Sequence, residues 1–526
     1  MAFTFQINND VVWNHDEKLL KKAITNTPKI LKTLVKPIAL GIVEKDDQYL
    51  NGYKVVPSSQ SIEKLPEQTL GRDESLILDL GNHYVGTFNI SIDSVGSPMD
   101  APLYLKLKFA EVPAELPANA ADYDGWLSRS WIQEEYVHID VLPAVLELPR
   151  RYSCRYIELT VIDSSPKWKA SFSNPEFLAE SCVSMSQLPE FDIADEELKT
   201  IYDTSVKTLL DCMQEVFEDG PKRDRRLWIG DLRLQALANY YTFNDLSLVK
   251  RCLYLFGGMT TDEGKIPANV FTAPNLIPDD TFLFDYSLFF AAILSDFIEH
   301  TGDTSVLEDL YSVAKKQIDY AKNLVDSEGR LQLTEDYPVF IDWSNEFNKE
   351  TAGQAVFIYS LKRFISLAEK MGEEELPEYR DLLDRMIAFS RQTLFDKATG
   401  QFIVEENGEI NTASQVWMVL AEVMTSEENK KIMQEMIRTQ FPITGIATPY
   451  MYHHIVEALF VAGLQEEAVQ LMKDYWGKMI SLGADTFWEA FKPEEQDFSP
   501  YGSPIVSSYC HAWSCTPAYL IPKYLS

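Results

Sequence analysis

The hydrophobic period of this chain changes near residue 190, and that change constrains the fold more than any other feature. Before it, apolar and polar residues alternate in short runs, such as S-L-I-L-D-L at residues 75–80 and R-Y-I-E-L-T-V-I-D at residues 155–163. Gly, Asn, Asp and Pro separate the runs. Alternation at this spacing is typical of an antiparallel β-sandwich. We therefore predict a first domain, a β-sandwich, over residues 1–190.

Beyond residue 190 the apolar residues recur at helical intervals. In residues 196–217, for example, Leu198, Ile201 and Leu209 fall on one face of a helix. Further helix-like segments follow, largely as pairs joined by loops, and the total of roughly a dozen suits six antiparallel hairpins closed into a toroid. We therefore predict an all-α (α/α)6 barrel over residues 191–526, and hence a multidomain chain. After the first helix, the predicted segments lie around residues 231–242, 246–255, 284–300, 305–325, 351–371, 378–394, 412–423, 428–439, 449–462, 466–480 and 503–524.

Charge and composition exclude several classes of function. The formal net charge of −33 at pH 7 is opposite to the basic footprint that binds nucleic acid or anionic lipid. The N-terminus lacks a basic start followed by an apolar run, and no stretch of sequence is long enough to cross a bilayer. We therefore expect a cytoplasmic protein with neither nucleic acid nor a membrane as partner. The sequence leaves the oligomeric state open, a homo-oligomer included.

Metal and cofactor signatures are missing from the sequence. The six cysteines have neither paired ligand spacing nor the density of a disulfide scaffold, so we expect buried free thiols. His453 and His454 are adjacent and face different sides of a predicted helix, and no H-E-x-x-H pattern occurs. There is also no P-loop, dinucleotide fingerprint or G-x-S-x-G nucleophile signal. We therefore expect no metal and no cofactor.

One loop between predicted helices carries an unusually dense set of charges. It reads E-D-G-P-K-R-D-R-R-L-W-I-G-D and spans residues 218–231. The Gly-Pro pair forces a sharp turn, which crowds Asp219, Arg223, Asp224 and Asp231. Arginine can hold carboxylates in bidentate geometry, so a structural ion-pair network at a barrel rim explains the cluster as well as a binding site does.

Two further loops each couple an acid to an aromatic ring. G-A-D-T-F-W-E-A-F contains the pair Trp488 and Glu489, and Y-P-V-F-I-D-W-S-N-E-F contains Asp342 and Trp343. Taken singly, each pair is explained as well by a half-buried tryptophan beside a surface carboxylate. Together, two carboxylates on different loops, with aromatic walls and no metal signature, are what cleavage of a glycosidic bond requires.

These motifs resemble those of the bacterial α-L-rhamnosidases of glycoside hydrolase family 78. D-G-P-K-R-D-R-R-L-W-I-G-D is similar to that family's signature D-C-P-x-R-E-R-x-G-W-x-G-D, and G-A-D-T-F-W-E is similar to its G-A-T-T-x-W-E. F-I-D-W resembles the family's aspartate-tryptophan loop, and S-S-Y-C-H-A-W resembles its late histidine segment. The resemblance covers the whole helical region in the family's order, and more weakly the preceding sandwich.

The resemblance implies a catalytic (α/α)6 barrel and an inverting glycosidase that releases terminal α-linked L-rhamnose from a small glycoside or oligosaccharide. The expected partner is therefore a carbohydrate substrate. By position, Asp224 would be the general acid and Glu489 the general base that activates water. We expect the sandwich to be structural, packing on the barrel or completing one rim. The residues that would bind or surround the sugar are Asp219, Arg223, Trp228, Asp231, Asp342, Trp343, Trp488 and His511.

The chain departs from the family pattern at three positions. Asp224 stands where the family usually has Glu, Gly220 where it has Cys, and Leu227 where it has Gly. The chain also ends soon after the last predicted helix, where many relatives continue into another β-sandwich, so we expect a divergent, compact member. Two other interpretations stay open. One is a six-hairpin glycosidase that acts on a fucose-like or a uronic-acid-bearing sugar; the loop arginines would bind the carboxylate of a uronic acid. The other is a catalytically inactive carbohydrate-binding protein.

Overall fold

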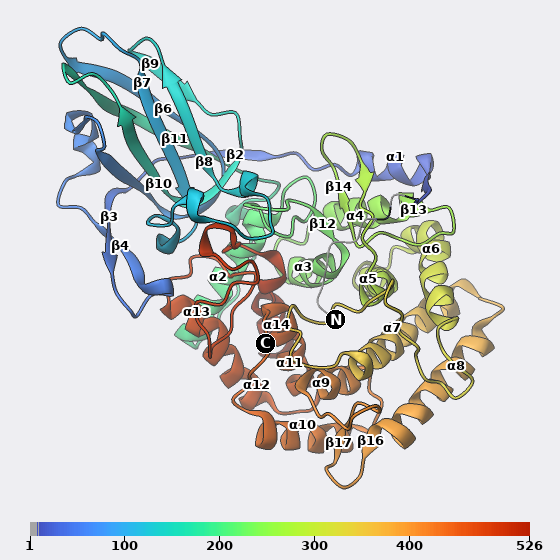
Figure 1. The fold of residues 1–526 in the computed structure, drawn as a ribbon. Helices are drawn as coiled ribbons and strands as arrows, with labels where there is room; N and C mark the ends of the chain where they lie inside the picture. The colour runs from blue at the N-terminus through green and yellow to red at the C-terminus, as the bar shows by residue number, and fades with distance from the viewer. Residues whose placement is uncertain (1–7, 9, 526) are drawn as a thin grey trace.

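A strand-rich part and a helical part follow one another along the chain, as Figure 1 shows. The computed structural model describes residue 8 and residues 10–525. In the strand-rich part, the paired strands run antiparallel. These strands are β2 (Leu31–Val35), β3 (Ala39–Lys45), β4 (Tyr53–Pro57), β5 (Thr69–Leu70), β6 (Ser75–Gly96), β7 (Leu103–Ala110), β8 (Glu134–Ile139), β9 (Ala144–Glu147), β10 (Tyr152–Asp163) and β11 (Trp168–Ser181).

Strand β6 joins two layers because it is long enough to take part in both. Its first half pairs with β10, and β7 and β8 continue that layer, while its second half pairs with β11, which β2 extends. The change of partner falls at Gly86, where a Cβ atom would lie 2.1 Å from the carbonyl oxygen of Leu178, so the close approach requires glycine. Buried side chains such as Phe88, Leu105 and Phe172 form the core of this part. The predicted antiparallel β-sandwich is confirmed.

The helical part consists of an inner and an outer ring. In the described part of the chain, the inner ring is formed by α3 (Ile229–Tyr241), α5 (Phe284–Thr301), α7 (Glu350–Met371), α9 (Thr412–Leu420), α11 (Pro449–Val461) and α14 (Pro517–Leu525). The outer ring is formed by α2 (Glu196–Cys212), α4 (Leu246–Gly258), α6 (Thr304–Lys322), α8 (Leu376–Phe389), α10 (Ser426–Gln440) and α12 (Gln465–Met472), which a π turn links to α13 (Lys478–Ser481).

Burial explains which helices lie inside. Every residue of α9 is buried, whereas α10 buries only the stripe formed by Asn429, Ile432, Met433 and Met436. A helix that is buried all round lies within a core, and a helix with one buried stripe lies at its edge. Successive inner helices contact one another and α14 contacts α3, which closes the ring and confirms the predicted (α/α)6 barrel. Among the described residues, no helix combines the length and apolar character needed to cross a bilayer.

The last predicted helix, over residues 503–524, is much shorter in the structure and begins only at Pro517. The residues before it form irregular chain with two short 3-10 turns, Pro504–Val506 and Ala512–Ser514. Their backbone groups pair elsewhere: Ser508 accepts a hydrogen bond from the amide of Glu489 (3.1 Å), and the amide of His511 donates to Phe487 (2.9 Å). Because long-range partners take these groups, the segment becomes a loop.

Residues ahead of the sandwich lie against the helical barrel. β1 (Trp13–His15) pairs with β13 (Met259–Thr261), and α1 (Glu17–Thr25) packs on α4, far from the sandwich in Figure 1. Arg251 on α4 donates to the carbonyl of Ala23 (2.9 Å) and to Thr27 Oγ1 (2.6 Å). The predicted domain boundary after residue 190 stays a prediction. The predicted first domain, residues 1–190, includes this segment that packs on the barrel. The remaining short strands are β12 (Leu227–Trp228), β14 (Asn269–Phe271), β15 (Ile277–Pro278), β16 (Phe395–Asp396) and β17 (Gln401–Phe402).

Candidate active site

A cavity of about 390 Å³ lies at the end of the barrel where the inner helices α3 and α5 begin. The loops that lead into or between the inner helices form most of its wall, and a loop of the sandwich forms the rest. Such a position is typical of ligand sites, because loops carry the chemistry that a rigid scaffold positions. The lining residues are Trp126, Leu127, Ser128, Trp131, Asp219, Arg223, Asp224, Arg226, Trp228, Asp231, Asp279, Asp280, Thr281, Leu283, Tyr286, Phe340, Trp343, Glu489, Tyr501, His511 and Trp513.

The charged loop at residues 218–231 folds into a tight hairpin at the cavity. The amide of Asp219 donates to the carbonyl of Arg226, and the amide of Arg226 donates to Asp219 Oδ1, each at 3.0 Å. Asp224 and Arg225 at the tip have left-handed backbones, with φ of 63° and 53°. Asp tolerates this region better than most residues other than glycine, which favours Asp at position 224. The hairpin presents Asp224 to the cavity.

Glu489 is buried, and both of its carboxylate oxygens are engaged. Oε1 accepts a hydrogen bond from the hydroxyl of Tyr501, and Oε2 accepts one from the guanidinium of Arg223. Burial raises the pKa of Glu489, while the Arg223 cation and the Tyr501 hydroxyl act to lower it. The same guanidinium lies 3.6 Å, Nη1 to Oδ1, from Asp224. One arginine therefore links the two carboxylates that the sequence singled out.

Asp219, Asp231 and His511 form the buried polar floor of the cavity. Burial raises the pKa of both aspartates well above the ordinary value, and nearby carboxylates add to the effect. Burial and the Arg223 cation lower the pKa of His511 well below its ordinary value, so its imidazole is neutral at pH 7. Asp231 Oδ1 lies 3.6 Å from His511 Nδ1, and within the described chain neither atom has a hydrogen-bond partner. Buried polar atoms of this kind are suited to binding ligand hydroxyls.

Aromatic rings form the side walls. Trp228 meets Tyr286 edge to face, with ring centroids 6.3 Å apart, and Trp343 meets Phe340 in the same manner at 5.5 Å. The ring of Trp513 stacks on Phe340 at 5.8 Å, and its Nε1 donates to the carbonyl of Glu489 at 2.9 Å. Such rings present large, rigid apolar faces beside the polar floor. The cavity therefore suits a small molecule with both apolar and hydroxyl-bearing sides.

Two of the predicted sugar-binding residues do not line the cavity. The Asp342 carboxylate accepts hydrogen bonds from the amides of Ser344 and Ala447, both at 2.9 Å, and from the hydroxyl of Thr448. These contacts take up both of its oxygens, and it joins two loops beneath the cavity instead of facing a ligand. The other eight predicted residues line the cavity: Asp219, Arg223, Asp224, Trp228, Asp231, Trp343, Glu489 and His511.

Trp488 is the second of the predicted sugar-binding residues that do not line the cavity. Its side chain is 1% exposed and packs edge to face against Tyr509 at 5.8 Å and Phe491 at 5.4 Å. Glu489 lines the cavity, while its chain neighbour Trp488 anchors the loop in the core.

Several further residues line the cavity and were not predicted from the sequence. Trp513 lies in the S-S-Y-C-H-A-W segment and could have been included with His511. Tyr501 and Tyr286 belong to no motif, and neither does the sandwich segment that contributes Trp126 and Trp131. These residues reach the cavity through long-range packing, which leaves no local signal in the sequence.

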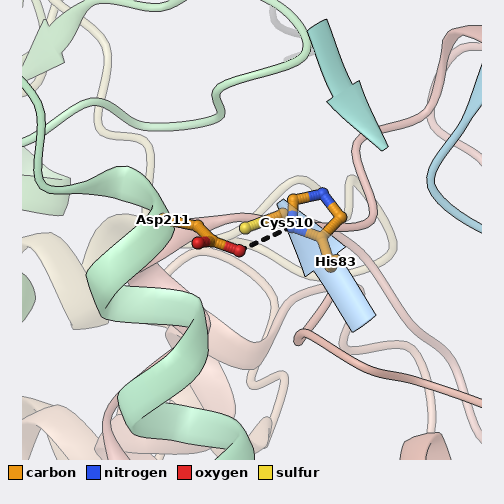
Figure 2. A group of neighbouring side chains, drawn as sticks. All are labelled: His83, Asp211 and Cys510. Carbon is orange, nitrogen blue, oxygen red and sulfur yellow. Dashed lines mark hydrogen bonds and ion pairs between the residues drawn. The ribbon is translucent and has the colours of Figure 1, made fainter. Parts of the chain in front are cut away.

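A buried polar cluster where the sandwich meets the barrel resembles a metal site in its residue types. His83, Asp211 and Cys510 bring three potential ligand atoms within 4.8 Å of one another (Figure 2). However, His83 Nδ1 lies 2.6 Å from Asp211 Oδ2, closer than the roughly 3.3 Å between two ligands of a tetrahedral zinc ion. Lys207 Nζ also lies 2.5 and 2.6 Å from the two Asp211 oxygens. The cluster therefore fits a charged hydrogen-bond network, in which Lys207 forms an ion pair with Asp211.

The comparisons with known proteins agree on one family. Residues 37–179 match the model of the glycosyl hydrolase family 78 alpha-rhamnosidase N-terminal domain, and residues 186–525 match that of the bacterial alpha-L-rhamnosidase 6 hairpin glycosidase domain. No curated protein matches the chain.

Solved structures support the same assignment. A rhamnosidase from Klebsiella oxytoca with rhamnose bound is 42% identical over 98% of this chain and 100% of its own, with a TM-score of 0.95. A family 78 rhamnosidase of Bacillus sp. GL1 shares the fold, with a TM-score of 0.72. It is 21% identical to this chain, and the match covers 86% of this chain and 47% of its own. With both family models matched in order, this chain belongs to glycoside hydrolase family 78, the α-L-rhamnosidases.

Proposed function

We propose that the protein is an inverting α-L-rhamnosidase, which hydrolyses a terminal α-linked L-rhamnose from a small glycoside. The observation that carries the proposal is the meeting of two carboxylates, Asp224 and Glu489, at the guanidinium of Arg223 inside an aromatic-walled cavity. Glycosidic bond cleavage needs one carboxyl group on each side of the scissile bond. The 42% identical Klebsiella oxytoca structure contains rhamnose, which supports that sugar as the substrate.

In the proposed reaction, Asp224 protonates the glycosidic oxygen as its bond to the anomeric carbon breaks. Glu489 accepts a proton from a water molecule, whose oxygen attacks the opposite face of that carbon and inverts it. Inversion requires the carboxyl groups to lie roughly 6.5–9.5 Å apart, with room for the water. The Arg223 guanidinium is hydrogen-bonded to Glu489 and lies 3.6 Å from Asp224, which brings both carboxyl groups to one cation.

Glu489 must be ionised to act as the base. Burial raises its pKa and so works against ionisation, whereas Arg223 and the Tyr501 hydroxyl favour the carboxylate. We infer that these two groups hold the base ready at neutral pH. They also orient both of its oxygens, which is the second requirement for proton transfer.

Asp219, Asp231 and His511 are the proposed partners of the sugar hydroxyls. Asp231 Oδ1 and His511 Nδ1, which lack hydrogen-bond partners within the described chain, can each take one hydroxyl. Trp343 and Trp513 offer apolar faces suited to the methyl group of a 6-deoxy sugar. A cytoplasmic location stays a prediction, and it would suit a small imported glycoside better than a polymer.

The uronic-acid alternative needs an arginine that can bind a substrate carboxylate. Arg223 is already engaged by Glu489 and lies beside Asp224. Arg225 donates to the backbone carbonyl of Arg151 at 2.9 Å. Arg226, the third arginine of the loop, lines the cavity with its guanidinium over the Phe271 ring. The proposal keeps L-rhamnose because the 42% identical Klebsiella oxytoca structure contains that sugar.

Release of p-nitrophenol from p-nitrophenyl α-L-rhamnopyranoside tests the proposal. We expect Glu489→Gln to lower kcat by about 10² to 10⁴-fold, because removing a positioned base has effects of this size. Asp224→Asn should lose less activity than Glu489→Gln on this substrate, since the activated leaving group needs little protonation. NMR of the first product should show the β anomer of L-rhamnose. Absence of turnover by the folded wild type, or the α anomer as first product, would refute the proposal.

A further inference from the structure

The sandwich contributes one wall of the cavity through the chain between β7 and β8. Trp126, Leu127, Ser128 and Trp131 all line the cavity, although they precede the helical barrel in sequence. The sandwich was expected to pack on the barrel or to complete one rim, and this loop lies at such a rim. Four consecutive or nearly consecutive residues facing a cavity form a continuous surface, which has to contact whatever occupies that side.

This loop is anchored to the barrel segment that carries Tyr501. Tyr123, Leu127 and Ile132 pack in one buried cluster with Tyr501 and with Ile505 and Val506 of the barrel. Within the loop, the amide of Leu127 donates to the hydroxyl of Tyr123 at 3.1 Å. The wall is therefore fixed in place by side chains on both sides of the domain interface.

Trp126 stands out on this anchored loop because the residue is 51% exposed. Its ring centroid lies 5.5 Å from that of Tyr501, at an interplanar angle of 48°. Tyr501 is buried and touches Glu489, so Trp126 continues the aromatic surface from the catalytic carboxylate outward to solvent. A rigid, exposed indole at the mouth of a cavity is a favourable surface for stacking.

The direction in which a bound glycoside would point follows from burial. Asp231 and His511, the proposed partners of the rhamnose hydroxyls, are buried at the floor. Asp224, the proposed acid, has a side chain that is 20% exposed. Since the acid protonates the oxygen shared with the leaving group, the leaving group lies on the solvent side, where the sandwich wall is.

From this arrangement we propose that Trp126 is a specificity-determining residue that stacks on the leaving group and favours glycosides whose leaving group begins with a planar aromatic ring. The inference rests on the proposed function. Trp126, Leu127 and Trp131 offer mainly apolar surface on this wall, and Ser128 supplies one hydroxyl. A planar apolar ring gains from such a wall, whereas a sugar ring would leave most of its hydroxyls without partners there.

The test compares three substrates that share the rhamnose and differ in the leaving group. They are p-nitrophenyl α-L-rhamnopyranoside, a disaccharide of rhamnose on glucose, and α-L-rhamnosyl fluoride, whose fluoride cannot reach the wall. For Trp126→Ala we expect kcat/KM for the aryl substrate to fall about tenfold, mainly because KM rises. A tenfold change corresponds to the free energy of about one aromatic contact. The value for the fluoride should stay within about twofold, and Trp126→Phe should recover most of the aryl activity.

Tyr136→Ala is the matched control, because Tyr136 is a 53% exposed aromatic residue of the same domain and does not line the cavity. It should leave all three substrates unaffected. If Trp126→Ala lowers kcat/KM equally for the aryl substrate and the fluoride, the residue acts by positioning Tyr501 and the inference is wrong. An equal loss for the disaccharide and the aryl substrate would also overturn it. Failure of the wild type on all three substrates would instead refute the proposed function.

Discussion

Replacing Tyr501 by phenylalanine tests how the proposed base is kept ionised. The Tyr501 hydroxyl donates to Glu489 Oε1, and Arg223 donates to the other oxygen of the same carboxylate. Tyr501→Phe removes one hydroxyl and keeps the ring, which lies 4.1 Å from the Arg223 guanidinium carbon. The substitution therefore separates the hydrogen bond from the packing of the aromatic side chain.

The expected effect follows from the strength of that hydrogen bond. A hydrogen bond to a charged group contributes about 1.5–3 kcal/mol, and about 1.4 kcal/mol corresponds to one pKa unit. The Tyr501 hydroxyl lowers the pKa of Glu489, in opposition to burial, which raises it. Removing the hydroxyl should therefore raise that pKa, and the acid limb of the kcat/KM profile should move to higher pH by roughly one to two pH units.

Initial rates on p-nitrophenyl α-L-rhamnopyranoside across the acid and neutral pH range measure this limb. Tyr450→Phe is the matched control, because Tyr450 is buried nearby and its hydroxyl has no hydrogen-bond partner within the described chain. It should leave the acid limb in place. An unmoved limb in a folded, active Tyr501→Phe variant, or an equal shift in Tyr450→Phe, would refute the reasoning.

Two further predictions concern the buried network between sandwich and barrel. Burial opposes the charged form of His83, but Cys510 and the hydrogen bonds to Asp211 and Glu111 raise its pKa to about 10. Because this value exceeds the unfolded one of about 6.5, the stability that the protonated imidazole contributes is complete below pH 6.5 and is lost towards pH 10. In urea unfolding, the free energy of unfolding should fall by up to about 1.4 kcal/mol per pH unit between pH 6.5 and pH 10. The fall with pH should be less steep in His83→Gln, and an equally steep fall would contradict a protonated His83 in the folded protein. Dialysis against EDTA should leave Tm and activity unchanged, since Lys207 already neutralises Asp211; a fall in Tm that zinc reverses would argue for a metal instead.

Local spacing in the sequence was sufficient to predict the two architectures and their order. Apolar and polar residues alternate over β7 and β10, and apolar residues recur at helical spacing over α2, because these side chains face a core. Such patterns can be recognised from neighbouring residues in the chain. The three loops singled out for their acid and aromatic content contribute Asp224, Trp343 and Glu489 to one cavity. Residue types alone could indicate the chemistry of those loops, because cleavage of a glycosidic bond needs carboxylates beside an apolar surface.

The tertiary structure alone decided which member of each pair faces the cavity. Asp342 and Trp488 point into the protein, where loop amides donate to the carboxylate and core rings pack against the indole. The sandwich wall around Trp126 likewise meets Tyr501 only through packing between the sandwich and the barrel, and the Tyr501 hydroxyl meets Glu489 because the chain between them folds back on itself. Side-chain direction and contacts between distant segments depend on the whole folded chain, so no local pattern in the sequence encodes them.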